Sequence, residues 1–176
     1  YGLADVEHRV PVTADTMFQS GSLGKQFTAA AVLLLEERGR LRLDDPISRY
    51  LPNLPPGWAP ITVRQLLSHT SGIHDSEEDG GEVFDLRREY TDDELLKVLQ
   101  SYPLNYAPGA RWKYSNSGYI VLGLIIEKAA GRSYDSFLRE AIFDPLAMRD
   151  TGYDQPRVVI ARRAQGHGRF LGILQN

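Results

Sequence analysis

The sequence predicts an α+β domain that is mostly helical and has its strands near the amino terminus. Residues 1–18 alternate loosely between apolar and polar residues, a pattern typical of strands. Residues 29–35 and 119–126 are strongly apolar, and each of these stretches follows a cluster rich in serine. Because serine is favoured at helix starts, we expect two core helices, each with polar side chains at its beginning.

Composition narrows the class of protein. The 176 residues suffice for one domain with a sizeable core, and the hydrophobic fraction of 42% is that of a globular protein. A net charge of -3 without a dense basic stripe gives no reason to expect a nucleic-acid partner. The absence of cysteine excludes disulfides and thiol catalysis. The apolar stretches are far shorter than the ~20 residues of a membrane span, so we expect none.

The first 18 residues are expected to form one or two strands that end in a turn at 14–15. The candidates for one shared face are Val6, Val10, Val12 and Phe18. A lone hairpin is only marginally stable, so these strands need partners from elsewhere.

The first helix is predicted to begin near Ser20 or Ser22, where a hydroxyl can cap free N–H groups, and to run to about Arg38. Gly39 is suited to end this helix in the left-handed conformation. Because the middle of the helix is apolar on most sides, we expect it in the centre of the fold, with Ser22 at its tip.

Ser22 and Lys25 lie three residues apart, so they share one face of this helix and the lysine amine can reach the hydroxyl. A serine is a poor nucleophile without a base, and a lysine serves as that base when burial lowers its pKa. In the alternative interpretation, Ser22 caps the helix and Lys25 is a solvated residue of the first turn. Taken alone, the S-x-x-K pattern favours this alternative, because so short a motif is common by chance.

The middle of the chain is predicted to contain short helices and loops. A turn and a short helix are expected at 41–50, followed by an extended loop around Trp58 that prolines interrupt. Capping-box patterns predict helices that start after Thr62 and Thr91. The acidic segment 75–82 is expected to be an exposed, mobile loop, and its carboxylates lack the spacing of a calcium loop.

His69 lies in a turn rich in serine, threonine and glycine, directly after the predicted Thr62 helix. A catalytic role is one interpretation. We favour a hydrogen-bonding brace, because the tight turn after the histidine offers backbone partners for both ring nitrogens.

A second polar cluster precedes the second core helix. Residues 115–117 are typical of a helix start, and the apolar stretch behind them ends near Gly131. Tyr114 and Asn116 are two residues apart, so in an extended or turn conformation both can point toward one space. In the alternative interpretation, Asn116 is only the helix cap and Tyr114 packs nearby. A third helix is expected after Ser133.

With S-L-G-K at 22–25 and Y-S-N at 114–116, the sequence resembles the serine β-lactamase and penicillin-binding-protein superfamily. The closest likeness is to its branch of class C β-lactamases, DD-peptidases and β-lactamase-like esterases. The stretches that look like this branch, in its order, are 18–29, 43–47, 61–72 and 108–119. The likeness covers about residues 1–155. It implies a β-lactamase/transpeptidase-like fold, of which this chain carries mostly the helical part, the N-terminal strand region and an incomplete sheet.

The resemblance implies a role for each of the polar residues. Ser22 would attack a carbonyl carbon and form an acyl-enzyme, with Lys25 and Tyr114 as the base system. Asn116 would hold the amide side chain of a substrate or orient Lys25. The backbone N–H of Ser22 would supply half of an oxyanion hole. No metal and no organic cofactor is expected.

This sequence differs from the family in its third motif, which is not found at the usual distance from Tyr-x-Asn. The third motif, Lys/His-Thr/Ser-Gly or a variant, comes much later after Tyr-x-Asn in the family, whereas only 60 residues follow Asn116 here. Gly166-His167-Gly168-Arg169 makes His167 a weak candidate for this motif. Residues 161–166 look more like a segment that stands earlier in the family, which is the better match because it needs no large deletion.

We therefore expect a single domain over 1–176 that is shortened at both ends. Its parts are a strand region with the nucleophile helix at 1–40, a helical region with the Tyr-x-Asn motif at 41–155, and a tail at 156–176 that no pattern defines. Such a piece would expose an unpaired strand edge and apolar surface, so it would be inactive or depend on self-association or on a complementing chain.

The expected function is that of a serine hydrolase on small esters, amides or β-lactams, with an esterase or peptidase favoured over a dedicated β-lactamase. The alternative is a non-catalytic ligand-binding or scaffold domain of the same fold. The compartment stays open between bacterial periplasm or secretion and the cytoplasm.

Overall fold

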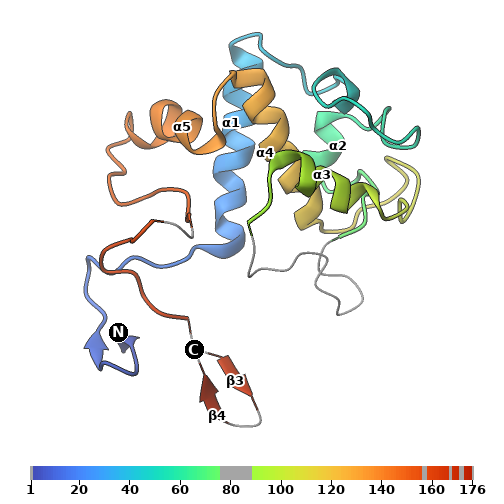
Figure 1. The fold of residues 1–176 in the computed structure, drawn as a ribbon. Coiled ribbons are helices and arrows are strands. Elements are labelled where there is room, and N and C mark those ends of the chain that lie inside the picture. The colour runs from blue at the N-terminus through green and yellow to red at the C-terminus, as the bar shows by residue number, and fades with distance from the viewer. Residues whose placement is uncertain (1, 76–88, 156–157, 167, 171–172, 176) are drawn as a thin grey trace.

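The computed structural model describes residues 2–75, 89–155, 158–166, 168–170 and 173–175. Two long helices, α1 (Lys25–Glu37) and α4 (Asn116–Ala130), run side by side in the same direction and begin at the same end of the helical region (Figure 1). Shorter helices surround this pair. The arrangement brings the two polar helix starts close together, although they are far apart in the sequence.

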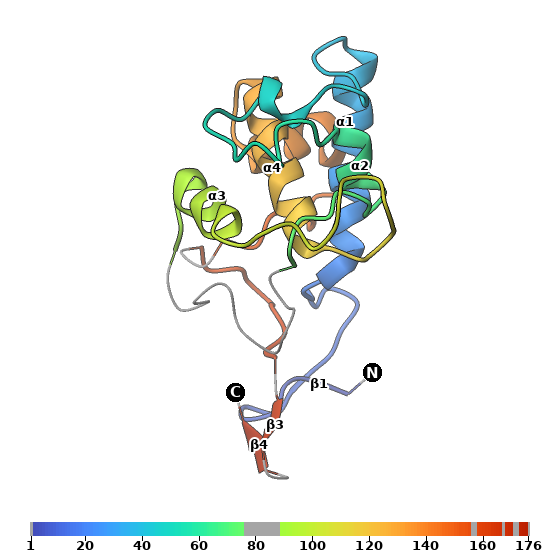
Figure 2. The ribbon, with the colours of Figure 1, turned by 90° about the vertical axis from the view of Figure 1, so that its right-hand side faces the viewer.

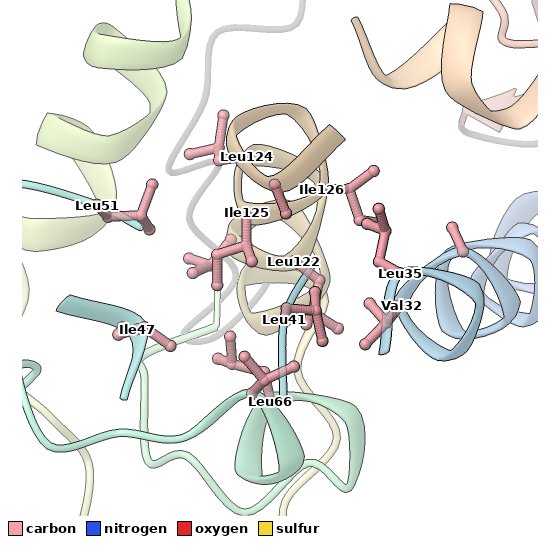
Figure 3. Packing of buried hydrophobic residues seen from close by; sticks show 14 of the residues in the cluster. Val32, Leu35, Leu41, Ile47, Leu51, Leu66, Leu122, Leu124, Ile125 and Ile126 are labelled. Carbon is pink, nitrogen blue, oxygen red and sulfur yellow. The ribbon is translucent and has the colours of Figure 1, made fainter. Parts of the chain in front are cut away.

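The core is built around α4. Its buried side chains are Ser117, Val121, Leu122, Leu124, Ile125, Ile126 and Ala129. Helices α1, α2 (Val63–Leu67) and α5 (Tyr134–Leu138) all pack against it. In Figure 3, Leu122 and Ile126 of α4 lie toward Leu35 of α1, and Leu66 of α2 closes the cluster from another side. Because α4 meets neighbours on several sides, almost its whole apolar sequence is used in the core.

Helix α1 differs from its expected central position. Only one face is buried, formed by Thr28, Ala31, Val32 and Leu35, whereas Leu33 on another face is 52% exposed. The sequence pattern shows that most sides of α1 are apolar, but the burial of each side depends on which elements pack against it. Within the described residues, α4, α5 and the turn after α5 cover one side.

The two leucines of α1 provide a matched test of this packing. Replacement of Leu35, which is 1% exposed, by alanine is expected to lower the free energy of unfolding by about 2–5 kcal/mol, because it leaves a cavity in the core. Leu33→Ala is expected to cost about 1 kcal/mol or less, since that side chain is half exposed. Urea denaturation of both variants measures the difference. Equal losses would contradict a one-sided burial of α1.

The helix ends follow the sequence in most cases. The capping boxes at Thr62 and Thr91 are both present, at the starts of α2 and α3 (Asp92–Gln100). Gly39 after α1 and Gly131 after α4 have φ of 66° and 70°, as a left-handed helix end requires. The short helix in the 41–50 stretch is η2 (Ile47–Arg49).

The start of α1 corrects one expectation. The helix follows a 3-10 turn, η1 (Gly21–Gly24), and Ser20 makes no side-chain cap hydrogen bond. Ser22 lies inside η1, and its hydroxyl oxygen accepts hydrogen bonds from the side chains of Lys25 and Tyr114. In α4, the cap is Ser115, whose Oγ accepts the N–H of Gly118 at 3.0 Å, so the interpretation of Asn116 as the cap is wrong.

The third helix begins after Ser133, as expected. The Ser133 side chain caps it by accepting the backbone N–H of Ser136. This helix is the short α5, which continues as a π-helical turn, η4 (Arg139–Phe143). Phe137, Leu138, Ile142 and Phe143 bury their side chains in the core.

In the part of the chain that the structure describes, four short strands form two separate pairs. β1 (Leu3–Asp5) pairs antiparallel with β2 (Val10–Pro11), and β3 (Gly168–Phe170) pairs with β4 (Ile173–Gln175). Both pairs lie beyond the helices, at one end of the molecule (Figure 2). The fold is therefore mostly helical with small two-stranded sheets, as the α+β prediction required.

The N-terminal strand region finds partners in the tail. Met17 bridges to Arg163, and the N–H of Gln165 donates to the carbonyl of Ala4 at 2.8 Å. The expected apolar face is not buried within the described residues, since Val10 is 47% and Phe18 61% exposed. Two expectations fall outside the described residues: the acidic loop beyond Asp75, and His167. In the part of the chain that is described, no helix has both the length and the apolar character needed to cross a membrane.

Candidate active site

The hydroxyl of Ser22 lies where the starts of α1 and α4 meet. The Tyr114 hydroxyl donates a hydrogen bond to Ser22 Oγ at 2.6 Å, and Lys25 Nζ donates to the same oxygen at 3.2 Å. Turn η1 brings Ser22 and Lys25 onto one face, as the spacing of three residues predicts. Tyr114 reaches across from the extended segment before α4, so two polar groups converge on one serine oxygen.

Lys25 connects the two helix starts. Its Nζ donates to Asn116 Oδ1 at 2.6 Å and lies 4.9 Å from the centre of the Tyr114 ring and 5.6 Å from that of Tyr119. A cation over an aromatic face is attracted by the electron density of the ring. The ammonium is therefore held on several sides by α4 and the residues that precede it. All four residues that the sequence singled out for chemistry, Ser22, Lys25, Tyr114 and Asn116, lie together.

The charge of Lys25 changes the acidity of Tyr114. Hydrogen bonding to Lys25, and then to Ser22, holds the pKa of the Tyr114 hydroxyl below its ordinary value of 10.0. A nearby cation favours the phenolate, and a hydroxyl that donates to the phenolate adds to that effect. Tyr114 is 38% exposed, and Ser22 is also exposed, so a small molecule can reach both oxygens. This arrangement can remove a proton from a serine hydroxyl and return it to another atom.

His69 packs beside this group. Its Nδ1 accepts the backbone N–H of Ser115 at 3.2 Å, and its ring lies 4.7 Å from that of Tyr114 and 5.0 Å from that of Tyr119. The hydrogen bond makes it a brace, as expected, but this ring-nitrogen partner comes from the start of α4 and not from the tight turn. Burial, and then the charge of Lys25, hold the pKa of His69 below its ordinary value of 6.5. Because Nδ1 accepts here, the brace needs the neutral ring.

The stability of the chain should therefore depend on the protonation of His69. The folded state binds this proton less readily than the unfolded state, so the free energy of unfolding falls as the pH drops through 6.5 toward the lower pKa of the folded form. One proton contributes a slope of at most about 1.4 kcal/mol per pH unit. His69→Gln keeps an acceptor but cannot titrate, and we expect it to flatten this dependence in urea denaturation at several pH values.

His8 is the control of opposite sign. A hydrogen bond to the Asp5 side chain raises the pKa of the exposed His8, so its contribution is present at low pH and is lost as the pH rises. His8→Gln should therefore remove stability on the acid side only. Identical pH profiles for wild type and His69→Gln would contradict the assignment of His69.

Asp75 is a residue of this site that the sequence did not reveal. It is only 6% exposed, and its Oδ1 accepts the backbone N–H groups of Asn116 at 2.9 Å and Ser117 at 3.2 Å. Its position at the edge of an acidic stretch suggested a place in an exposed loop. One signal was available: the first turn of α4 holds no acidic residue of its own to match its positive end.

The segment that carries His69 and Asp75 lies closely against the chain before α4. The N–H of Asn105 donates to the carbonyl of Gly72 at 2.8 Å, and that of Gly109 donates to the carbonyl of Thr70 at 2.7 Å. Gly72 has a φ of 79°, and a Cβ on it would lie 2.2 Å from the carbonyl oxygen of Tyr106. Only glycine satisfies both the backbone angle and the close approach.

A cleft of about 990 Å³ lies beside η1 and the start of α1. Its lining includes Lys25 of the site together with Leu23, Phe27, Tyr134 and Phe143, but neither Ser22 nor Tyr114. We therefore place the candidate site by the convergence of the polar groups and not by this cleft. In the described residues, no group of three or more histidine, aspartate and glutamate side chains is arranged to hold a metal ion.

Known proteins resemble this chain over nearly its whole length. The Beta-lactamase family matches residues 1–172. Penicillin-binding protein 4* of Bacillus subtilis (strain 168) is 36% identical over 153 residues, which cover 86% of this chain and 34% of that protein. Esterase EstB of Burkholderia gladioli is 39% identical over 166 residues, which cover 86% of this chain and 42% of the esterase.

A solved structure agrees in the fold as well as in the sequence. The D-amino acid amidase from Ochrobactrum anthropi SV3, in complex with D-phenylalanine, superposes with a TM-score of 0.84 at 34% identity, over 97% of this chain and 48% of the amidase. The chain thus spans between about a third and a half of the length of these three proteins.

Proposed function

This chain belongs to the beta-lactamase family, and we propose that it is a serine hydrolase that cleaves small esters, amides or β-lactams through an acyl-enzyme on Ser22. The observation that carries the proposal is the convergence of the Tyr114 hydroxyl and the Lys25 ammonium on Ser22 Oγ, at 2.6 and 3.2 Å. A nucleophile within hydrogen-bond reach of its base is the arrangement that covalent catalysis needs. The lowered pKa of Tyr114 supports its part as that base.

In the proposed acylation, the ionised Tyr114 takes the proton of Ser22 while Oγ attacks the carbonyl carbon of the substrate. The carbonyl π bond opens, and the negative charge moves to its oxygen. The backbone N–H of Ser22, in the first turn of η1, would donate to that oxygen, where the positive ends of η1 and α1 also favour negative charge. When the intermediate collapses, the bond to the leaving group breaks and Tyr114 returns its proton to that group.

Deacylation follows by the same groups in reverse. Tyr114 takes a proton from a water molecule, and the hydroxide attacks the acyl carbon. The bond from that carbon to Ser22 Oγ then breaks, Oγ takes the proton from Tyr114, and the acid product leaves. The hydrogen bond from Lys25 favours the Tyr114 phenolate at each step. Asn116 would hold Lys25 through its Oδ1 and leave its amide nitrogen for the substrate.

Among substrates, we propose esters and amides ahead of β-lactams. Two of the three named relatives support this order, since one is an esterase and another a D-amino acid amidase, whereas the third is named a penicillin-binding protein. Turnover of p-nitrophenyl butyrate, a D-alanyl peptide and nitrocefin on the same preparation tests the order. We expect the ester or the peptide to be cleaved fastest. A nitrocefin rate far above the other two would reverse the ranking, and no turnover or adduct with any of them would favour a non-catalytic ligand-binding domain.

A further inference from the structure

We propose that Asp75 is a positioning residue for the chemistry of this site: its carboxylate fixes the Tyr114–Asn116 segment by accepting two backbone N–H groups at the start of α4. The inference rests on the proposed function, because it assigns the residue to the reaction of Ser22.

Asp75 is a buried side chain that holds the first turn of α4 by hydrogen bonds. The side chain comes from a segment 41 residues earlier than Asn116, is only 6% exposed, and accepts the N–H groups of Asn116 and Ser117 with one oxygen, at 2.9 and 3.2 Å. Hydrogen bonds from N–H groups to a carboxylate are roughly twice as strong as those between neutral groups. Since α4 is 15 residues long, its positive end adds to the attraction.

One of the two amides that Asp75 holds belongs to Asn116, which contacts Lys25, and the other to the next residue, Ser117. Asn116 also accepts from Lys25 through its side chain, and Tyr114 precedes it by two residues. His69 accepts the N–H of Ser115, so three consecutive backbone N–H groups are held by one short segment. Release of two of these bonds would move Tyr114 and Asn116 relative to Ser22, and a displacement of about 1 Å can slow a reaction ~100-fold.

Asp75 also contributes charge. Its carboxylate raises the pKa of both Tyr114 and His69, whereas Lys25 lowers both. Lys25 from α1, His69 from the same segment as Asp75, and Tyr119 from α4 are the other titratable groups around Tyr114. The carboxylate therefore partly offsets Lys25, and its removal would lower the pKa of Tyr114 further.

Two variants separate the hydrogen-bonding role of Asp75 from the effect of its charge. Asp75→Asn keeps an oxygen that accepts the two N–H groups and removes the charge, whereas Asp75→Ala removes both. Asp45→Ala is the matched control, because Asp45 is another buried carboxylate, 8% exposed, that accepts the N–H of Arg42 at 2.9 Å and the hydroxyl of Tyr50 at 2.5 Å, with no contact to the site residues.

The experiment measures two properties of the full chain. One is the rate at which a fluorescent penicillin labels Ser22 across a range of pH. The other is the hydrogen exchange of the backbone amides of Asn116 and Ser117, followed by NMR. We expect Asp75→Ala to speed the exchange of both amides at least tenfold and to slow labelling by about 100-fold.

We expect Asp75→Asn to speed the exchange much less than Asp75→Ala does, to keep the maximal labelling rate near that of the wild type, and to move the acid limb of the labelling profile to lower pH. Asp45→Ala should leave the amides of 116 and 117 unchanged. Unchanged exchange in Asp75→Ala, or an equal loss of labelling in Asp45→Ala, would overturn the inference. If the wild type is not labelled at all, the proposed function fails, and amide exchange alone decides whether Asp75 holds α4.

Discussion

Ser22→Ala is expected to abolish the covalent adduct and to lower hydrolysis by at least about 10⁴-fold. The reason is that Ser22 Oγ is the oxygen to which both Tyr114 and Lys25 donate, so the variant leaves these groups without the nucleophile they surround. Removal of a catalytic serine in other hydrolases costs up to about 10⁶-fold in kcat. Intact-protein mass spectrometry after incubation with a β-lactam, together with ester turnover, measures the effect.

Ser20→Ala is the control for this variant. Ser20 is exposed, lies two residues earlier, and makes no cap hydrogen bond, so its loss should leave the adduct and the rate unchanged. An adduct of the same mass on Ser22→Ala would show that another residue is the nucleophile and would contradict the assignment.

Lys25→Met is expected to have the second largest effect. The variant keeps an unbranched side chain but removes the ammonium whose hydrogen bond is the largest cause of the lowered pKa of Tyr114. Loss of a general base typically costs about 10²–10⁴-fold, so activity near neutral pH should fall by that factor. Since Tyr114 works as the phenolate, a higher pKa means that the acid limb of the pH–rate profile moves to higher pH, and part of the activity returns in alkali.

The pH profile distinguishes this effect from a loss of stability. Lys97→Met on α3 removes a lysine from an exposed surface and should leave both the rate and the profile as in the wild type. A Lys25→Met profile with a lower maximum but an unmoved acid limb would mean that Lys25 does not set the ionisation of Tyr114.

The parts of the site that the sequence predicted are local. Ser22 and Lys25 are three residues apart on one helix start, and Tyr114 and Asn116 are two apart before another, so chain geometry alone sets much of their arrangement. The same holds for the capping boxes of α2 and α3. That the Ser22–Lys25 pair and the Tyr114–Asn116 pair meet in one site followed only from the resemblance to a known superfamily. No local pattern specifies which helix lies beside which.

Apart from the local details of the two helix starts, the parts that the sequence missed depend on tertiary packing. Asp75 stands at the edge of an acidic stretch, and only the packing of its segment against α4 makes it a buried acceptor. His69 was expected to find its partners in its own turn, but the N–H that it accepts is 46 residues away. Likewise, because α1 is apolar on most sides, its sequence does not predict that Leu35 is buried and Leu33 half exposed.

The glycine at 72 has a consequence for the interpretation of random mutant libraries. Any side chain there must displace the carbonyl of Tyr106. That shift would disturb the nearby backbone hydrogen bonds that keep the segment with His69 and Asp75 in place. Loss-of-function clones would thus accumulate at a codon that encodes no reacting group. Selection for activity would report residue 72 alongside Ser22, although the two are constrained for different reasons, one by chemistry and the other by the space between two stretches of main chain.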